Sequence, residues 1–171
     1  EAWLSAVRGL GLAATEIGTT RWGFLHQLWL EYFQARGLTR AGKAAAIVQQ
    51  LAPPPLQDLD TLVGSLHADE RLPGPGTCPL EEPFKLAVQV ADDADDWVRR
   101  AARTNVALAA RAAAACPRDE TSPAGELVAP CGRRASIQPQ TVRELKAGLV
   151  RRSRDPAVDL RHRIEAGEDL G

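Results

Sequence analysis

The sequence contains no methionine, three cysteines, and only four Trp, three Phe and one Tyr among 171 residues. The cysteines Cys78, Cys116 and Cys131 are an odd number without C-x-x-C spacing, which is typical of a reducing cytosol. No apolar run approaches the about 18 residues that a membrane-spanning helix needs, so we expect no membrane partner. The net charge of −1 gives no overall attraction to nucleic acid or to an anionic membrane.

Two further absences bear on function. The chain has no G-x-x-x-x-G-K-[ST] phosphate loop, so we expect it to bind no ATP by itself. It also has no secretory signal and opens within an expected helix, so we expect a piece of a longer cytoplasmic protein. Arg far outnumbers Lys and Ala is abundant, which indicates a GC-rich bacterial genome. With 44% apolar residues, the chain can bury one moderate core or two small ones.

The most distinctive stretch is 22–36, WGFLHQLWLEYFQAR, because most of the aromatic residues lie in it. Aromatic side chains bury large areas, so we expect the densest packing here. No Gly or Pro occurs between Phe24 and Gly37, which predicts a helix over these residues. Apolar positions cover nearly its whole circumference. The helix should therefore be buried between neighbours, with His26 and Glu31 needing polar partners.

The same stretch resembles a signature of NACHT-type signalling ATPases, the STAND class. The matching residues are 24–27 (FLHQ), 31–33 (EYF) and 35–36 (AR). Leu30 and Gln34 depart from the residues usual in that family. There the motif ends the winged-helix part of the nucleotide-binding module, and its histidine contacts the β-phosphate of ADP in the closed state. The resemblance implies that His26 senses ADP in a longer parent protein.

The residues before the signature suit the same module. Residues 1–12 are predicted to be helical, and 12–24 to form a hairpin with Gly18 at its turn. Helix, hairpin, helix is the order found at the end of a winged helix. We therefore expect residues 1–38 to be the C-terminal part of a winged-helix domain.

Residues 39–80 are predicted to be connecting helices and a Pro/Gly-rich loop. One helix is expected over 39–51 and ends at the proline run 53–55, which cannot continue it. A second, short helix is expected over 56–66. The prolines and glycines of 67–83 then predict a loop, which is the best candidate for a domain boundary.

Residues 81–171 predict a HEAT-like α-helical array, in which short amphipathic helices bury their apolar faces against one another. The expected helices are 81–91, a short stretch around 97–102, 106–115, 140–152 and 157–170. The inward residues of the last two are expected to be Val142, Leu145, Leu149, Leu160, Ile164 and Gly167. Asp93, Asn105 and Asp155 are placed to cap helices.

Part of this array carries a second resemblance. Residues 105–111 (NVALAAR), 154–161 (RDPAVDLR) and 163–167 (RIEAG) resemble the helical linker of bacterial proteins that join a NACHT ATPase to a formylglycine-generating-enzyme-like domain. This resemblance implies two partners in the same parent chain: an upstream nucleotide-binding domain and a downstream domain. It also implies ADP or ATP as the ligand of the parent, which could self-oligomerise.

His26 has two interpretations. A lone histidine on an apolar helix is most often a core residue whose ring bonds a backbone carbonyl. The resemblance instead implies that the His26 ring donates a hydrogen bond to a phosphate oxygen, which an imidazole N–H can do. Glu31 is expected to form a structural ion pair or a cap.

The acidic cluster of Asp92, Asp93, Asp95 and Asp96 is not expected to bind a metal. It lacks the EF-hand spacing and the bidentate Glu of a calcium site. Two of its members suit the first turns of helices, where carboxylates are favoured.

Zinc and catalysis are not expected either. Cys116 and Cys131, with His67 or His162, match no zinc-ligand spacing, so structural cysteines are the better interpretation. No Ser, His or Asp grouping has the context of a nucleophile elbow. We therefore expect no enzyme activity, no metal and no cofactor in this chain.

Residues 133–163 contain nine basic and three acidic side chains. Such an excess could attract nucleic acid or an acidic partner domain. No aromatic residue is interleaved for base stacking, which argues against single-stranded nucleic acid. We expect a solvated face or an intramolecular contact.

The sequence thus predicts a mainly α fold: the end of a winged helix followed by a HEAT-like α-helical array. The expected function is a non-catalytic regulatory segment that couples a nucleotide switch to a downstream sensor or effector domain. The alternative is a stand-alone helical-repeat scaffold for protein–protein interaction. A third class, a nucleic-acid-binding helical domain, would need the basic residues of 133–163 to share one face. A phosphate loop encoded upstream of Glu1 would favour the first.

Overall fold

The computed structural model describes residues 13–15, 22–24, 27–40, 49–116 and 137–171. Its elements are β1 (Ala13–Thr15), β2 (Trp22–Phe24), α2 (Gln27–Arg40), α4 (Leu59–Ser65), α5 (Glu81–Val90), α6 (Ala94–Ala102), α7 (Val106–Ala115), α8 (Pro139–Arg154) and α9 (Leu160–Glu168). The expectation of a mainly α fold is confirmed. Among these described helices, none is both long and apolar enough to cross a membrane.

The predicted hairpin is confirmed. β1 pairs antiparallel with β2, and Ala13 lies opposite Phe24. The helix expected over 1–12 and the turn residue Gly18 lie outside the described residues. Because Phe24 belongs to β2, the helix that follows begins later than expected, at Gln27.

Helix α2 also continues past Gly37, where we expected it to end, and reaches Arg40. A glycine inside a helix costs about 1 kcal/mol relative to alanine, which weakens a helix without terminating it. The Thr39 hydroxyl donates to the Arg36 carbonyl at 3.1 Å and adds a local bond to this last turn.

The expectation that α2 is buried on all sides is wrong. Leu28, Leu30 and Tyr32 are 62%, 40% and 41% exposed, whereas Ala35 and Glu31 are buried. The reason is that α2 packs along α5, so burial is confined to part of its circumference. An apolar pattern around a helix predicts neighbours on every side, but the described neighbours of α2 cover only some of them.

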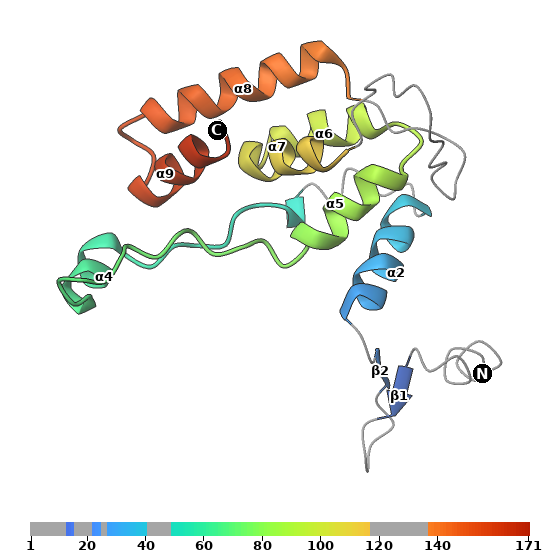
Figure 1. Ribbon diagram of the computed structural model, residues 1–171, viewed down its shortest axis with the longest axis horizontal. Coiled ribbons are helices and arrows are strands. Elements are labelled where there is room, and N and C mark those ends of the chain that lie inside the picture. Colours follow the sequence, from blue (N-terminus) through green and yellow to red (C-terminus); the bar gives the residue numbers. More distant parts are fainter. Residues whose placement is uncertain (1–12, 16–21, 25–26, 41–48, 117–136) are drawn as a thin grey trace, which may run out of the picture.

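The hydrophobic core lies instead among α5, α6, α7 and α8 (Figure 1). Its largest fully buried side chains include Phe84, Val88, Val98 and Leu108. Phe84 packs against Trp97 of α6, with ring centroids 6.2 Å apart. Other parts of the chain join this core: Leu51 and Cys78 are buried in it, and Leu38 of α2 packs against it. The core thus includes residues from before the Pro/Gly-rich loop as well as after it.

Local sequence signals set the ends of the core helices, as expected. Pro83 lies in the first turn of α5, where its missing N–H leaves no broken bond. Asp93 caps α6 by accepting the Asp96 N–H at 2.9 Å. Asn105 caps α7 by accepting the Leu108 N–H at 3.1 Å.

Helix α8 buries Leu145 and Leu149 as expected, but Val142 is 36% exposed. Leu149 belongs to a second, smaller buried cluster with Ala107 and Ala166, which joins α7, α8 and α9. In Figure 1, α8 lies alongside α6 and α7, and α9 folds back beneath it.

Helix α9 begins at Leu160, three residues later than the sequence pattern predicts. Asp159 is its N-cap and accepts the Arg161 N–H at 2.9 Å, whereas Asp155 caps only the preceding turn. The buried face of α9 also differs from the expected one, because Arg161 and Ala166 are the residues that it buries. Leu160 and Ile164, which we expected to be inward, are 43% and 46% exposed.

Residues 52–79 form an arm. Figure 1 shows the segments on either side of α4 running side by side, with α4 at the far end. Helix α4 has no buried residue. The arm is held to α9 close to α4, where the Arg161 guanidinium donates to the Gln57 carbonyl.

Candidate functional site

His26, the nucleotide-sensing residue implied by the NACHT resemblance, lies outside the described residues. Its neighbour Gln27 begins α2 and donates its side-chain amide to Glu31 Oε1 at 2.7 Å. Glu31 is only 8% exposed, so this bond satisfies a carboxylate that is nearly buried. The partner of Glu31 recorded by the structure is therefore an amide one turn away.

A cavity of about 520 Å³ lies between this part of α2 and the start of α5 and is lined by residues of both. Gln27, Glu31 and Gln34 of α2 line it on one side, and Cys78 and Glu81 on the other. The signature stretch thus shares a cavity with the first turn of α5. Glu81 also belongs to the most connected polar cluster that we find in the described fold.

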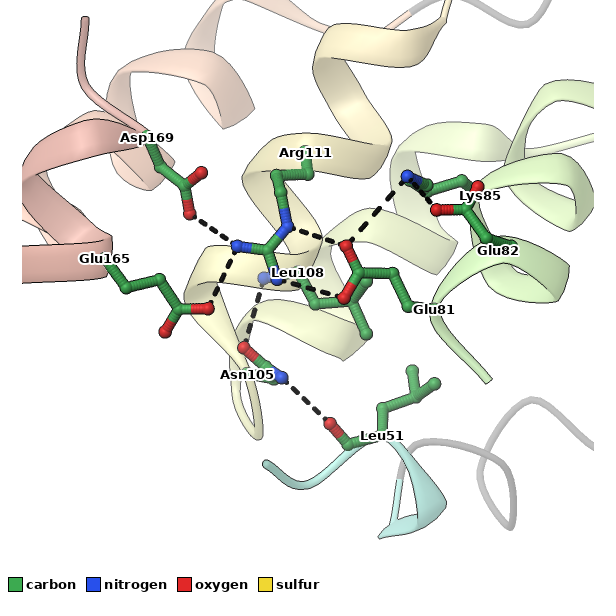
Figure 2. A network of polar contacts seen from close by, with 9 residues as sticks. All are labelled: Leu51, Glu81, Glu82, Lys85, Asn105, Leu108, Arg111, Glu165 and Asp169. Atoms are coloured by element: carbon green, nitrogen blue, oxygen red, sulfur yellow. Dashed lines mark hydrogen bonds and ion pairs between the residues drawn. The ribbon is translucent and has the colours of Figure 1, made fainter. Parts of the chain in front are cut away.

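That cluster is centred on Arg111 of α7 and is drawn in Figure 2. The Arg111 guanidinium forms a two-pronged pair with Glu81, with Nε–Oε1 2.9 Å and Nη2–Oε2 3.2 Å. Its Nη1 donates to Glu165 Oε1 at 3.0 Å and to Asp169 Oδ2 at 2.9 Å. One side chain therefore joins α5, α7 and the C-terminal helix α9. We call these four residues the Arg111 junction.

The charges at the junction are unequal, because three carboxylates face one guanidinium. Burial would lower the pKa of Arg111, but its bonds to Glu81 and Glu165 and the charge of Asp169 outweigh burial and raise it. Burial raises the pKa of Asp169, with the charges of Glu165 and Glu81 adding to it, against the lowering effect of Arg111. Lys85 lies 3.9 Å from Glu81 Oε1 and supplies further positive charge.

A second polar contact lies close to the junction (Figure 2). Asn105 uses its side-chain oxygen to cap α7, and its Nδ2 donates to the Leu51 carbonyl at 3.1 Å. The capping role follows from the sequence, whereas the bond to Leu51 does not. It fastens the chain segment after α2 to the start of α7.

The Arg111 junction was not anticipated, although the sequence carries a signal for it. Arg111 is the one charged residue in the helix sequence VALAARAAAA. A single arginine in an apolar helix that packs against its neighbours needs carboxylate partners. That reasoning predicts a buried ion pair but not which carboxylates take part in it.

The acidic cluster at the start of α6 has structural uses. Asp93 is the N-cap, and Asp96 pairs with Arg100 at 2.6 Å. Asp95 is buried and accepts the Gln138 N–H at 2.9 Å, so it links α6 to the start of α8. Within the described ranges no group of three His, Cys, Asp or Glu residues has the arrangement of a metal site.

The cysteine and histidine candidates do not come together in the described fold. Burial raises the pKa of the Cys116 thiol to about 11, so the thiol is protonated at neutral pH. His162 lies on α9, where its Nε2 is buried without a hydrogen-bond partner in the part of the chain described. Cys131 lies outside the described residues.

Some basic residues of the 133–163 region are used within the fold. Arg161 pairs with Asp159 at 2.8 Å, and Arg163 Nε donates to the Ser153 carbonyl at 3.1 Å. Arg133 and Arg134 lie outside the described residues. The expected intramolecular contacts are thus confirmed for two residues of the region.

The contacts described above form a continuous path. Helix α2 packs on α5, α5 packs on α7, and Arg111 joins both α5 and α7 to α9. If α2 moved, the packed helices and the ion pairs of Arg111 would therefore either resist the movement or transmit it to α9. Comparisons with protein-family models, curated proteins and solved structures give no match to this chain.

Proposed function

We propose that this chain is a non-catalytic, helical coupling segment of a bacterial, cytoplasmic NACHT-type STAND ATPase. In this proposal it links a nucleotide switch on its N-terminal side to a sensor or effector domain on its C-terminal side. The segment itself holds no cofactor, and ADP or ATP binds the parent. The winged-helix end over 1–38 and the HEAT-like character of 81–171 are parts of the same proposal.

The observation that carries the proposal is the Arg111 junction. It bonds the first turn of α5, which borders the signature stretch, to the last helix of the chain. Coupling between distant sites needs a physical element that both sites can bias. A charged cluster that joins three helices is such an element, because moving any one helix breaks bonds to the others.

The coupling is tested in the intact parent with Arg111→Met, which keeps the apolar stem and removes the charge. In the unaltered parent, we expect ADP to shift the self-association constant by about 5- to 150-fold, the usual range for allosteric coupling. With Arg111→Met, the shift should fall below about twofold, because a movement of α5 is no longer transmitted to α9 through the Arg111 ion pairs. Light scattering with and without ADP gives both constants.

The matched control is Arg100→Met, which removes the exposed ion pair between Arg100 and Asp96 on α6. It should leave the nucleotide dependence intact. If Arg111→Met folds and self-association still responds fully to ADP, the coupling role is wrong.

The nucleotide-sensing role of His26 has its own test. A hydrogen bond from the His26 ring to the β-phosphate is charge-assisted and contributes about 1.5–3 kcal/mol. His26→Ala in the parent should then weaken ADP binding by roughly ten- to a hundredfold and favour the open form. Unaltered ADP affinity in a well-folded variant would leave His26 as a core histidine.

A helical scaffold for protein–protein interaction is the second candidate. It is favoured by Leu160 and Ile164, which lie one turn apart on α9 and are both well exposed. A scaffold would capture its partner with residues 1–171 alone, and nucleotide would not change the affinity. The coupling role predicts instead that nucleotide bound to the parent changes the affinity for the partner.

A further inference from the structure

A groove of about 410 Å³ lies between α6 and α8. Arg99 and Arg103 line it from α6 and its C-terminal end, and Arg151 lines it from α8. All three side chains are exposed. The groove therefore carries positive charge on both of its sides.

The buried lining of the groove is mostly apolar, with the Thr141 side chain as its polar member. Leu145 is 5% exposed, and Val106 and Gly148 are half-buried beside it. A Cβ added at Gly148 would lie 2.9 Å from Val106 Cγ2, so α8 approaches the start of α7 closely and closes the floor. An apolar floor with charged sides fits a ligand that is itself part apolar and part charged.

The three arginines differ from the paired arginines Arg100 and Arg161. Arg100 pairs with Asp96 at 2.6 Å and Arg161 with Asp159 at 2.8 Å. Over the same described ranges, the side chains of the groove arginines make no hydrogen bond or ion pair. Unpaired guanidinium groups on both sides of one groove can bind carboxylates in two-pronged geometry.

We propose that this groove binds an acidic peptide segment of another protein or domain, with one of its apolar side chains seated on the Leu145 floor. Nucleic acid fits less well. Glu144 also lines the groove and repels any anion, but only a peptide can offset this by placing an apolar side chain on the floor, which a phosphate backbone lacks. No aromatic side chain lines the groove within the described residues, so bases have no stacking partner. This inference does not depend on the coupling role.

Fluorescence anisotropy with three labelled probes tests it on the 171-residue chain. The probes are a peptide of Glu and Leu, a peptide of Glu and Ser with the same charge, and an oligothymidine of that charge. We expect the Glu/Leu peptide to bind about tenfold more tightly than the other two because a leucine is buried. Its affinity should fall as salt is added, because the rim charges are exposed.

Single substitutions locate the site. Arg99→Gln and Arg151→Gln should each weaken the Glu/Leu peptide by about two- to fivefold, as removal of one exposed charge pair does. The matched control is Arg71→Gln, an exposed arginine in the loop before α5, which should leave the affinity unchanged. Far-UV circular dichroism checks that each variant is folded.

Three outcomes would overturn the proposal. Equal binding of the two peptides would mean that only surface charge is recognised. Tighter binding of oligothymidine would assign the groove to nucleic acid. If both arginine substitutions match the Arg71 control, the peptide binds elsewhere or not at all. None of these outcomes bears on the response of the parent to ADP, so the two proposals fail separately.

Discussion

At the scale of single residues, Arg111 balances the negative charge of three carboxylates within the described fold. Its side chain is 27% exposed, and the side chains of its three carboxylate partners are 11–19% exposed. Water screens such pairs less than surface pairs. Removing the one cation would leave three nearby carboxylates that repel one another.

Arg111→Met should accordingly lower the free energy of unfolding by about 3 kcal/mol, the low end for breaking a buried pair. The exposed Arg100–Asp96 pair provides the comparison, and Arg100→Met should cost less than about 1 kcal/mol. Urea unfolding at neutral pH measures both. Equal, small losses would show that the junction contributes no more than a surface pair.

His162 predicts a dependence of stability on pH. Burial lowers the pKa of His162 from its ordinary 6.5, and Arg152 and Arg161 lower it further, against the raising effects of Glu165 and Asp159. Below pH 6.5 the unfolded chain therefore binds a proton that the folded chain resists, so stability falls as the pH falls.

We expect His162→Gln to flatten this loss below pH 6.5, and His67→Gln, a substitution in an exposed loop, serves as the control. Asp169, with its raised pKa, acts in the opposite direction, because its stability contribution is lost as the pH rises above 3.8. Comparing each variant with the unaltered chain removes the Asp169 contribution. Parallel curves for all three proteins would exclude His162 as the cause.

At the scale of elements, the structure moves the expected centre of stability from α2 to α5. Phe84 on α5 is fully buried and packs on Trp97, whereas Phe33 on α2 is half-buried with its ring 5.6 Å from that of Tyr32. The sequence pattern alone predicts the larger loss at Phe33.

Phe84→Ala should therefore cost about 3–5 kcal/mol, and Phe33→Ala less than half as much. The difference reflects the cavity left among packed helices at Phe84 and the partial access of water at Phe33. Urea melts of the two variants rank them. A larger loss at Phe33 would show that α2 is the main core helix after all.

Two glycines inside helices test how closely the elements pack. Gly37 in α2 has nothing within 4 Å of an added Cβ, so Gly37→Ala should stabilise the chain by about 0.5–1 kcal/mol through helix propensity. A Cβ added at Gly148 in α8 would lie 2.9 Å from Val106 Cγ2, and a helical valine cannot easily turn away.

Gly148→Ala should therefore be destabilising, by about 1 kcal/mol after the gain in helix propensity is subtracted. Val106→Ala in the same chain removes the clash and should make the added methyl group favourable. Thermal melts give the signs. Stabilisation by Gly148→Ala alone would mean that α7 and α8 are less tightly packed than described.

At the scale of the whole molecule, the expectation of a nucleotide-free segment remains a prediction. Because the sequence has no phosphate loop, residues 1–171 alone should show no ADP or ATP binding in calorimetry, up to about 1 mM nucleotide. The parent should bind ADP. Micromolar binding by the segment itself would overturn its assignment as a coupling segment and require a phosphate site of another kind.

Most of the helices could be predicted from the sequence, because their signals are local. The caps at Asp93 and Asn105 act over three residues, and the inward positions of α5, such as Phe84 and Val88, repeat at helical spacing. The hairpin was predicted for the same reason. His26, the one candidate site residue, came from a resemblance, and it lies outside the described residues.

What the sequence by itself determined is therefore most of the described helices and much of the face that each one buries, whereas the helices expected over 1–12 and most of 39–51 fall outside the described residues. The tertiary structure decided which faces find partners: α2 is covered by α5 on part of its surface, and α9 turns Arg161 and Ala166 inward in place of Leu160 and Ile164. It also decided the partners of Arg111, which are 30 residues away at Glu81 and 58 residues away at Asp169. Periodicity and capping act within about four residues, whereas these contacts form only once separate helices have packed together.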